Sequence, residues 1–162
     1  AVAKVVAAIL LSVSLFMAGV GCEVIAAYNY LTYEGFEPDM AKLAYDFEKN
    51  AFIAADGSLG SNPRKISGLF KAMGVGYKRF YKADEAQAAV EEGKPVVVSY
   101  HIGLNIFSGI HTVFAVKEEG RLYVYNCYNS AADKTEVESI YQLMNKNSLF
   151  IVGYTEDDGQ MR

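Results

Sequence analysis

The sequence is poor in cysteine, lacks tryptophan and has no strong excess of charge, and these shortages exclude several classes of protein. Its two cysteines, Cys22 and Cys127, lie far apart. That spacing fits neither the dense disulfide framework of a small secreted protein nor the close cysteine pairs of a structural zinc site. Charged residues make up 21% of the chain and the net charge is -4, with the basic residues spread along the sequence. We therefore expect no nucleic-acid partner.

What the chain does contain is apolar material for a large core. Hydrophobic residues make up 52% of its 162 residues. A chain of this size buries most of its apolar surface without disulfide or metal staples. We expect a single domain over residues 1–162.

The N-terminal stretch has two interpretations, because no charge occurs between Val5 and Cys22. Residues 1–20 can form an apolar helix that packs within the domain, close to the lower length limit for a membrane span. They can also form a signal or anchor segment, with Cys22 acylated as in a membrane lipoprotein. Membrane association through residues 1–20 therefore stays open. So does location, which is cytoplasmic under the first interpretation and exported or membrane-associated under the second.

The hydrophobic pattern changes along the chain from helical spacing to the alternation of strands. Helices are predicted over residues 22–33 and 38–50, from Asn62 to about Gly74, and over 84–92. Strands are predicted over 76–81, 95–100, 111–116, 122–126 and 148–154. Thr135 with Glu138 predicts a capping box and one more helix. Helices followed by an antiparallel sheet indicate an α+β fold.

Cys22 is the first residue with a pattern suited to catalysis. It follows glycines at the start of an apolar helix, where backbone N–H groups stabilise a thiolate and lower the thiol pKa. We therefore expect a Cys22 pKa below that of a free cysteine. Glu23 acts in the opposite direction, because an adjacent carboxylate disfavours a second negative charge. A nucleophilic role for Cys22 thus requires a histidine partner.

His111 and Asn126 can supply the base and the group that orients it, because they begin and end one predicted hairpin. A two-residue turn at Glu118 and Glu119 would place Asn126 opposite His111, whereas a three-residue loop would place Cys127 there. His101 is a weaker candidate, in a predicted loop. The two cysteines and the two histidines match no zinc-ligand spacing, so we expect no metal and no cofactor.

Four stretches together resemble a known family: GCEVIAAYNYL, GSNPRKISGLFKAMG, GKPVVVSYHIG and HTVFAVKEEGRLYVYN. In order and spacing they are similar to the bacterial papain-like cysteine peptidases related to the bacteriocin-processing peptidases, which cleave leader peptides after double glycines. The resemblance implies a papain-like fold, a peptide or protein substrate, and a catalytic triad of Cys22 as nucleophile, His111 as base and Asn126 as its orienter.

One departure from that family weakens the expected activity. The family's oxyanion hole uses a glutamine a few residues before the cysteine, and Phe16 stands near that position here. Loss of one such donor lowers turnover by about a hundredfold to a thousandfold. The sequence therefore leaves open a slow cysteine peptidase, a catalytically inactive peptide-binding or immunity-type module on the same fold, and the lipoprotein named above.

Overall fold

The computed structural model describes residues 21–49, 62–103, 109–127, 133–144, 148–157 and 159. Residues 1–20, for which the sequence offers a buried helix or a targeting segment, lie outside this described part. Up to residue 92 the described part of the chain is mainly helical, as predicted. Its helices are α2 (Gly21–Tyr33), α3 (Met40–Lys49), the short 3-10 helix η1 (Pro63–Lys65), α4 (Ile66–Ala72) and α5 (Ala83–Glu91). A final short helix, α6 (Ile140–Leu143), lies near the C-terminal end.

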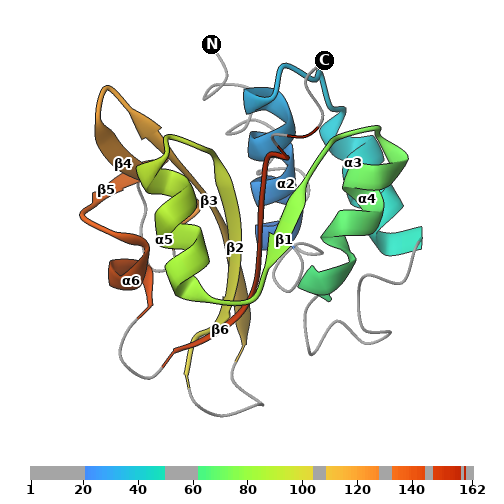
Figure 1. Cartoon of the computed structure of the whole chain (residues 1–162). Coiled ribbons are helices and arrows are strands. Elements are labelled where there is room, and N and C mark those ends of the chain that lie inside the picture. The colour runs from blue at the N-terminus through green and yellow to red at the C-terminus, as the bar shows by residue number, and fades with distance from the viewer. Residues whose placement is uncertain are drawn as a thin grey trace.

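A six-stranded antiparallel sheet forms the centre of the molecule (Figure 1). Its strands run in the order β1-β6-β2-β3-β4-β5. They are β1 (Lys78–Phe80), β2 (Val96–His101), β3 (Ile110–Glu118), β4 (Arg121–Tyr125), β5 (Lys134–Val137) and β6 (Leu149–Thr155). The last strand lies between β1 and β2, so the C-terminal segment joins the early edge strand to the rest of the sheet.

The sheet separates two hydrophobic cores. On one face, α2, α3 and α4 bury side chains such as Tyr30, Phe47 and Phe70 against β2, β3 and β6. On the other face, α5 and α6 cover a second cluster, which includes Phe80 of β1, Val113 of β3 and other residues of β2 and β3. Because side chains alternate along a strand, β3 supplies Phe114 and Val116 to the first core and Val113 and Ala115 to the second. This arrangement confirms the predicted α+β class.

Local sequence signals explain where several helices begin and end. Asn62 caps η1, since its side chain accepts a hydrogen bond from the Arg64 backbone N–H at 3.1 Å, and Pro63 occupies the first helical position. Gly35 has a φ of 83° just after α2, a left-handed conformation that glycine adopts without strain. These ends lie where the sequence analysis expected them.

The predicted helix after Thr135 is wrong, because residues Lys134–Val137 form strand β5. Thr135 pairs with Val124 of β4 instead of capping a helix. The helix α6 starts five residues later, at Ile140, whose backbone N–H donates to the Gln87 side chain at 2.8 Å. Pairing with the neighbouring strand therefore outweighed a local capping pattern.

Among the helices that the structure describes, none is long and apolar enough to cross a membrane.

Candidate active site

The thiol of Cys22 lies at the start of α2, the helix that packs against β3. Its Sγ donates a hydrogen bond to Glu23 Oε2 at 3.0 Å. The backbone of Thr112 also hydrogen-bonds the sulfur. Thr112 directly follows His111, so the structure brings the sulfur to the backbone next to the expected base.

The Glu23 carboxylate dominates the polar surroundings of this thiol. Only 1% of Glu23 is exposed. Burial of the sulfur and the negative charge of Glu23 together raise the pKa of the Cys22 thiol above its ordinary value. The backbone hydrogen bonds from Thr112 and Glu23 act in the opposite direction but do not outweigh these effects. The expected lowering of the Cys22 pKa is therefore wrong, and the thiol is protonated at neutral pH.

His111 is held by the backbone of Asn126. The His111 Nε2 atom lies 2.6 Å from the Asn126 carbonyl oxygen. A carbonyl only accepts hydrogen bonds, so Nε2 of the neutral ring carries the proton and Nδ1 is the basic nitrogen. Burial lowers the pKa of His111 below its usual value, and the bond to Asn126 offsets part of that effect. The ring is therefore neutral at pH 7, with the tautomer that a general base needs.

The conformation of Asn126 makes this contact possible. Asn126 follows the last residue of β4 and has a φ of 62°, in the left-handed region that asparagine tolerates better than most residues. Its carbonyl meets His111, while its Nδ2 donates to the Thr112 carbonyl oxygen at 3.3 Å. One residue therefore holds both the imidazole and the strand segment that contacts the Cys22 sulfur.

The pairing of β3 explains why the Thr112 backbone is available to the site. Thr112 faces Ser99 of β2, and their buried hydroxyl oxygens lie 2.9 Å apart. Such close side chains are typical of a non-hydrogen-bonded antiparallel pair, in which the backbone N–H and C=O point toward the opposite strand edge. On that edge the ladder with β4 begins only at Phe114. The backbone of Thr112 is thus left for Cys22 and Asn126.

Both hairpin registers considered for the sequence are wrong. The turn consists of Glu119 and Gly120, with φ values of 52° and 82°, so Glu118 pairs with Arg121. The ladder ends at the pair of Phe114 and Tyr125, and neither Asn126 nor Cys127 pairs with His111. Asn126 reaches His111 through its backbone instead of through a facing side chain.

The remaining candidates lie elsewhere. His101 is the last residue of β2 and is half-buried, so it is not in a loop as expected. Cys127 lines a cavity of about 240 Å³ together with Tyr100, Ile102 and residues of β5 and α6. Phe16 lies outside the described residues. Within the described ranges, no three His, Cys, Asp or Glu side chains gather where they could hold a metal ion.

Sequence reasoning missed one contributor to the site and underestimated another. Thr112 carries no chemical signal in the sequence, because it acts through its backbone. Glu23 was recognised as an opposing charge, and its burial strengthens that effect.

A cysteine at the start of a helix, packed against a strand that carries a histidine, is the arrangement of papain-like thiol proteins. The comparisons agree. The model of the Peptidase_C39-like family matches residues 11–149, and the chain belongs to this family. A candidate C39-like peptidase from Bacillus anthracis has a similar crystal structure, with a TM-score of 0.51, 17% sequence identity, and coverage of 85% of this chain and 89% of the other. That likeness supports the papain-like fold. No curated protein matches the chain.

Proposed function

We propose that this chain is a cysteine peptidase in which Cys22 is the nucleophile, His111 the general base and Asn126 the residue that orients His111. The observation that carries the proposal is the contact between the Cys22 sulfur and the Thr112 backbone, beside an imidazole whose Nε2 is fixed on Asn126. Family membership makes a peptide or protein the expected substrate.

The reaction follows from the protonation states of the two groups. The neutral His111 ring takes the thiol proton on Nδ1 while the Cys22 sulfur forms a bond to the substrate carbonyl carbon. The same proton then passes to the departing amine nitrogen as the C–N bond breaks, leaving a thioester on Cys22. Water hydrolyses the thioester, with its proton passing through His111 back to the sulfur.

Asn126 contributes by stabilising the charged form of the ring. When His111 becomes an imidazolium, the Asn126 carbonyl accepts a stronger, charge-assisted hydrogen bond from Nε2. In this proposal the backbone carbonyl performs the task that a side-chain amide performs in the sequence-based expectation.

A second candidate function is a peptide-binding protein that does not catalyse. The observation that favours it is the hydrogen bond from Cys22 to the buried Glu23 carboxylate, which holds the thiol in its unreactive, protonated form. The absence of a glutamine upstream of Cys22 adds to this possibility.

Turnover of a pooled fluorogenic peptide library by the full chain separates the two functions. We expect cleavage that is abolished in Cys22→Ala and in His111→Ala. Cys127→Ala serves as the matched control and keeps its activity, because Cys127 faces the other core. Thermal melting of each variant shows whether it is folded. Cleavage by folded Cys22→Ala would contradict the nucleophile assignment, whereas wild-type binding without cleavage supports the second function.

A further inference from the structure

Tyr100 of β2 lies directly opposite the candidate base His111 of β3. The two residues form a pair in the ladder between these strands. Their ring centres are 6.0 Å apart and their planes meet at an angle of 87°. This is the edge-to-face geometry that aromatic rings favour. Only 3% of Tyr100 and 9% of His111 are exposed, so the contact is made inside the protein.

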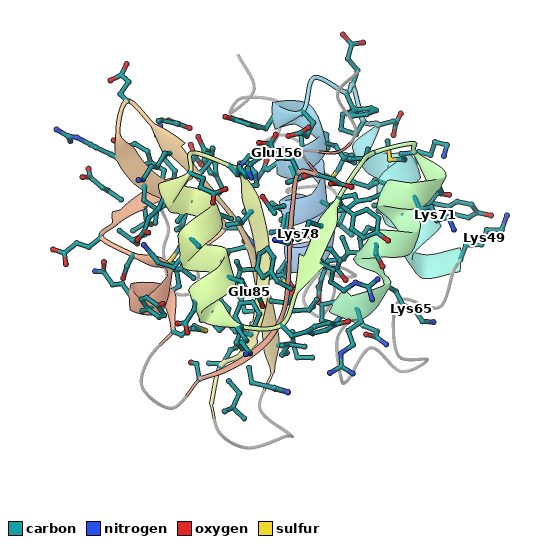
Figure 2. The ribbon with its side chains drawn as sticks, in the orientation of Figure 1. Lys49, Lys65, Lys71, Lys78, Glu85 and Glu156 are labelled. Atoms are coloured by element: carbon teal, nitrogen blue, oxygen red, sulfur yellow. The ribbon has the colours of Figure 1, made fainter. Side chains whose placement is uncertain are left out.

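The contact lies in the second core, on the side of the sheet that α5 and α6 cover. Tyr100 is a member of that core, and Figure 2 shows side chains filling the space between α5 and the sheet. Ordinary packing therefore accounts for the burial of an aromatic ring at this position. Burial alone does not require that the ring stand perpendicular to the imidazole of the candidate site.

The hydrogen bond to Asn126 fixes one atom of the His111 ring and not its plane. The Asn126 carbonyl oxygen holds Nε2 at 2.6 Å, but the torsion that turns a histidine ring has broad minima, so the ring can tilt about this anchor. Asn126 also lies beyond the last pair between β3 and β4, Phe114 with Tyr125. The direction in which Nδ1 points depends on the tilt. A rigid neighbour at the side of the ring is therefore needed to aim Nδ1.

Tyr100 is such a neighbour, because its strand is held on both sides. β2 lies between β3 and β6 and pairs with each of them (Figure 1). Its ladder with β3 continues without interruption past Tyr100 to the pair of His101 and Ile110. On the β6 side the register shifts between Ser99 and Tyr100, as at a β-bulge. Bulges are common beside active sites, where they change the direction of a side chain.

We propose that Tyr100 is a positioning residue, whose ring limits the tilt of the His111 imidazole and so aims Nδ1 toward the Cys22 thiol. This inference rests on the proposed function, in which His111 is the general base. Tyr100 touches no reacting atom, so its effect on turnover passes through His111. A catalytic group displaced by about 1 Å can lower a rate by about a hundredfold. The ring should therefore affect kcat much more than KM.

Three variants of the full chain separate this role from packing. Tyr100→Leu removes the ring and keeps an apolar side chain, whereas Tyr100→Phe keeps the ring and removes the hydroxyl. Phe80→Leu is the matched control, because Phe80 is 2% exposed in the same core but lies on β1, which β6 and β2 separate from β3. Thermal melting shows whether each variant is folded. Tyr100→Met, with its adaptable side chain, takes the place of Tyr100→Leu if the leucine variant is unfolded.

The first measurement is the NMR order parameter of the His111 ring, which reports ring motion and needs no substrate. The chain has 2 histidines, so His111→Gln identifies the His111 signals. We expect the order parameter to fall in Tyr100→Leu and to keep its wild-type value in Tyr100→Phe and Phe80→Leu. The second measurement is the steady-state kinetics on one fluorogenic peptide that the wild type cleaves. In Tyr100→Leu we expect kcat to fall by about tenfold to a hundredfold while KM stays within about twofold, with kcat within about threefold in the other two variants.

Several results would overturn the positioning role. They are an unchanged order parameter in Tyr100→Leu, an equal fall in Phe80→Leu, and a fall in Tyr100→Leu that leaves kcat unchanged. A loss of kcat in Tyr100→Phe as large as in Tyr100→Leu would also overturn it, because the hydroxyl and not the ring would then act. If the wild type cleaves no peptide, or His111→Ala cleaves normally, the proposed function fails instead. The order parameter then decides by itself whether Tyr100 fixes the ring.

Discussion

Replacing Glu23 by glutamine should activate the Cys22 thiol. In the structure the Cys22 Sγ donates to a carboxylate that is almost completely buried. Ionising the thiol would place a second negative charge beside the first. Burial is the largest cause of the raised pKa of Cys22, and this repulsion is the second. Glu23→Gln keeps the size and an accepting oxygen while it removes the charge.

The expected effect follows from the distance between the two groups. For charges 3.0 Å apart, an effective dielectric constant of about 20 gives a repulsion of roughly 5 kcal/mol. This is an upper bound, because the thiolate and the carboxylate would move apart. Even a quarter of that energy corresponds to a tenfold larger thiolate fraction at a pH below the thiol pKa. The alkylation rate follows the thiolate fraction, so we expect a gain of at least about tenfold.

Alkylation by iodoacetamide between about pH 6 and pH 10, read separately for Cys22 and Cys127 by mass spectrometry, measures this gain. Cys127 is the internal reference. Glu37→Gln is the matched control. It also removes one carboxylate charge, but Glu37 is exposed and follows the end of α2, whereas Cys22 lies at the start of that helix. An unchanged or slower rate at Cys22 in Glu23→Gln would refute the electrostatic argument. A gain of the same size in Glu37→Gln would refute it too.

Three further predictions concern the orienting residue, the pH and the packing. Asn126→Gly should keep peptide turnover within about tenfold, because it retains the backbone carbonyl that contacts His111. Asn126→Ala should be about 1 kcal/mol less stable than Asn126→Gly in urea unfolding, because alanine is strained at the positive φ of this position. A much larger loss of turnover in Asn126→Gly would show that the side chain orients His111. The folded state lowers the pKa of His111 from its ordinary value of 6.5, so on acidification the unfolded state takes up a proton first. The free energy of unfolding should therefore fall by up to about 1.4 kcal/mol per pH unit below about pH 6.5. His111→Gln should lose this pH dependence. Gly153→Ala should cost about 1 to 3 kcal/mol, since its Cβ would overlap the Phe80 ring, while Gly68→Ala on the open side of α4 should not destabilise; equal melting temperatures for the two variants would contradict this packing.

Much of the fold could be predicted because hydrophobic spacing and capping residues act locally. The helix that carries Cys22 and the one that follows Asn62 needed only an apolar stripe and a cap. Strand β5 could not be predicted, because its pairing with β4 depends on residues distant in sequence. Thr135 and Glu138 fit a helix start by themselves, and only the position of Val124 in space decides for a strand.

The hairpin turn was misplaced for a related reason. Glutamate rarely adopts a positive φ, so the sequence favoured turns in which Gly120 alone has that conformation. Glu119 nevertheless has a φ of 52°. The observed register between β3 and β4 places Leu122 and Val124 in the second core, and their burial outweighs the backbone strain at Glu119.

The site was predictable at the level of residue types and not at the level of atoms. Cys22, His111 and Asn126 were selected by their positions in the motifs, and the structure gives His111 and Asn126 a direct hydrogen bond. That this bond uses the Asn126 backbone depends on one dihedral angle, which the sequence does not specify. The raised pKa of Cys22 likewise depends on how deeply the sulfur and Glu23 are buried.

Covalent trapping tests most directly the claim that Cys22 is the nucleophile. The full chain is incubated with a pool of peptide electrophiles, and the modified residue is located by peptide mapping. The account predicts a peptide adduct on Cys22 that forms more slowly in His111→Ala, because the base that removes the thiol proton is gone. An adduct that forms only on Cys127, or on Cys22 at a rate that does not depend on His111, would contradict it.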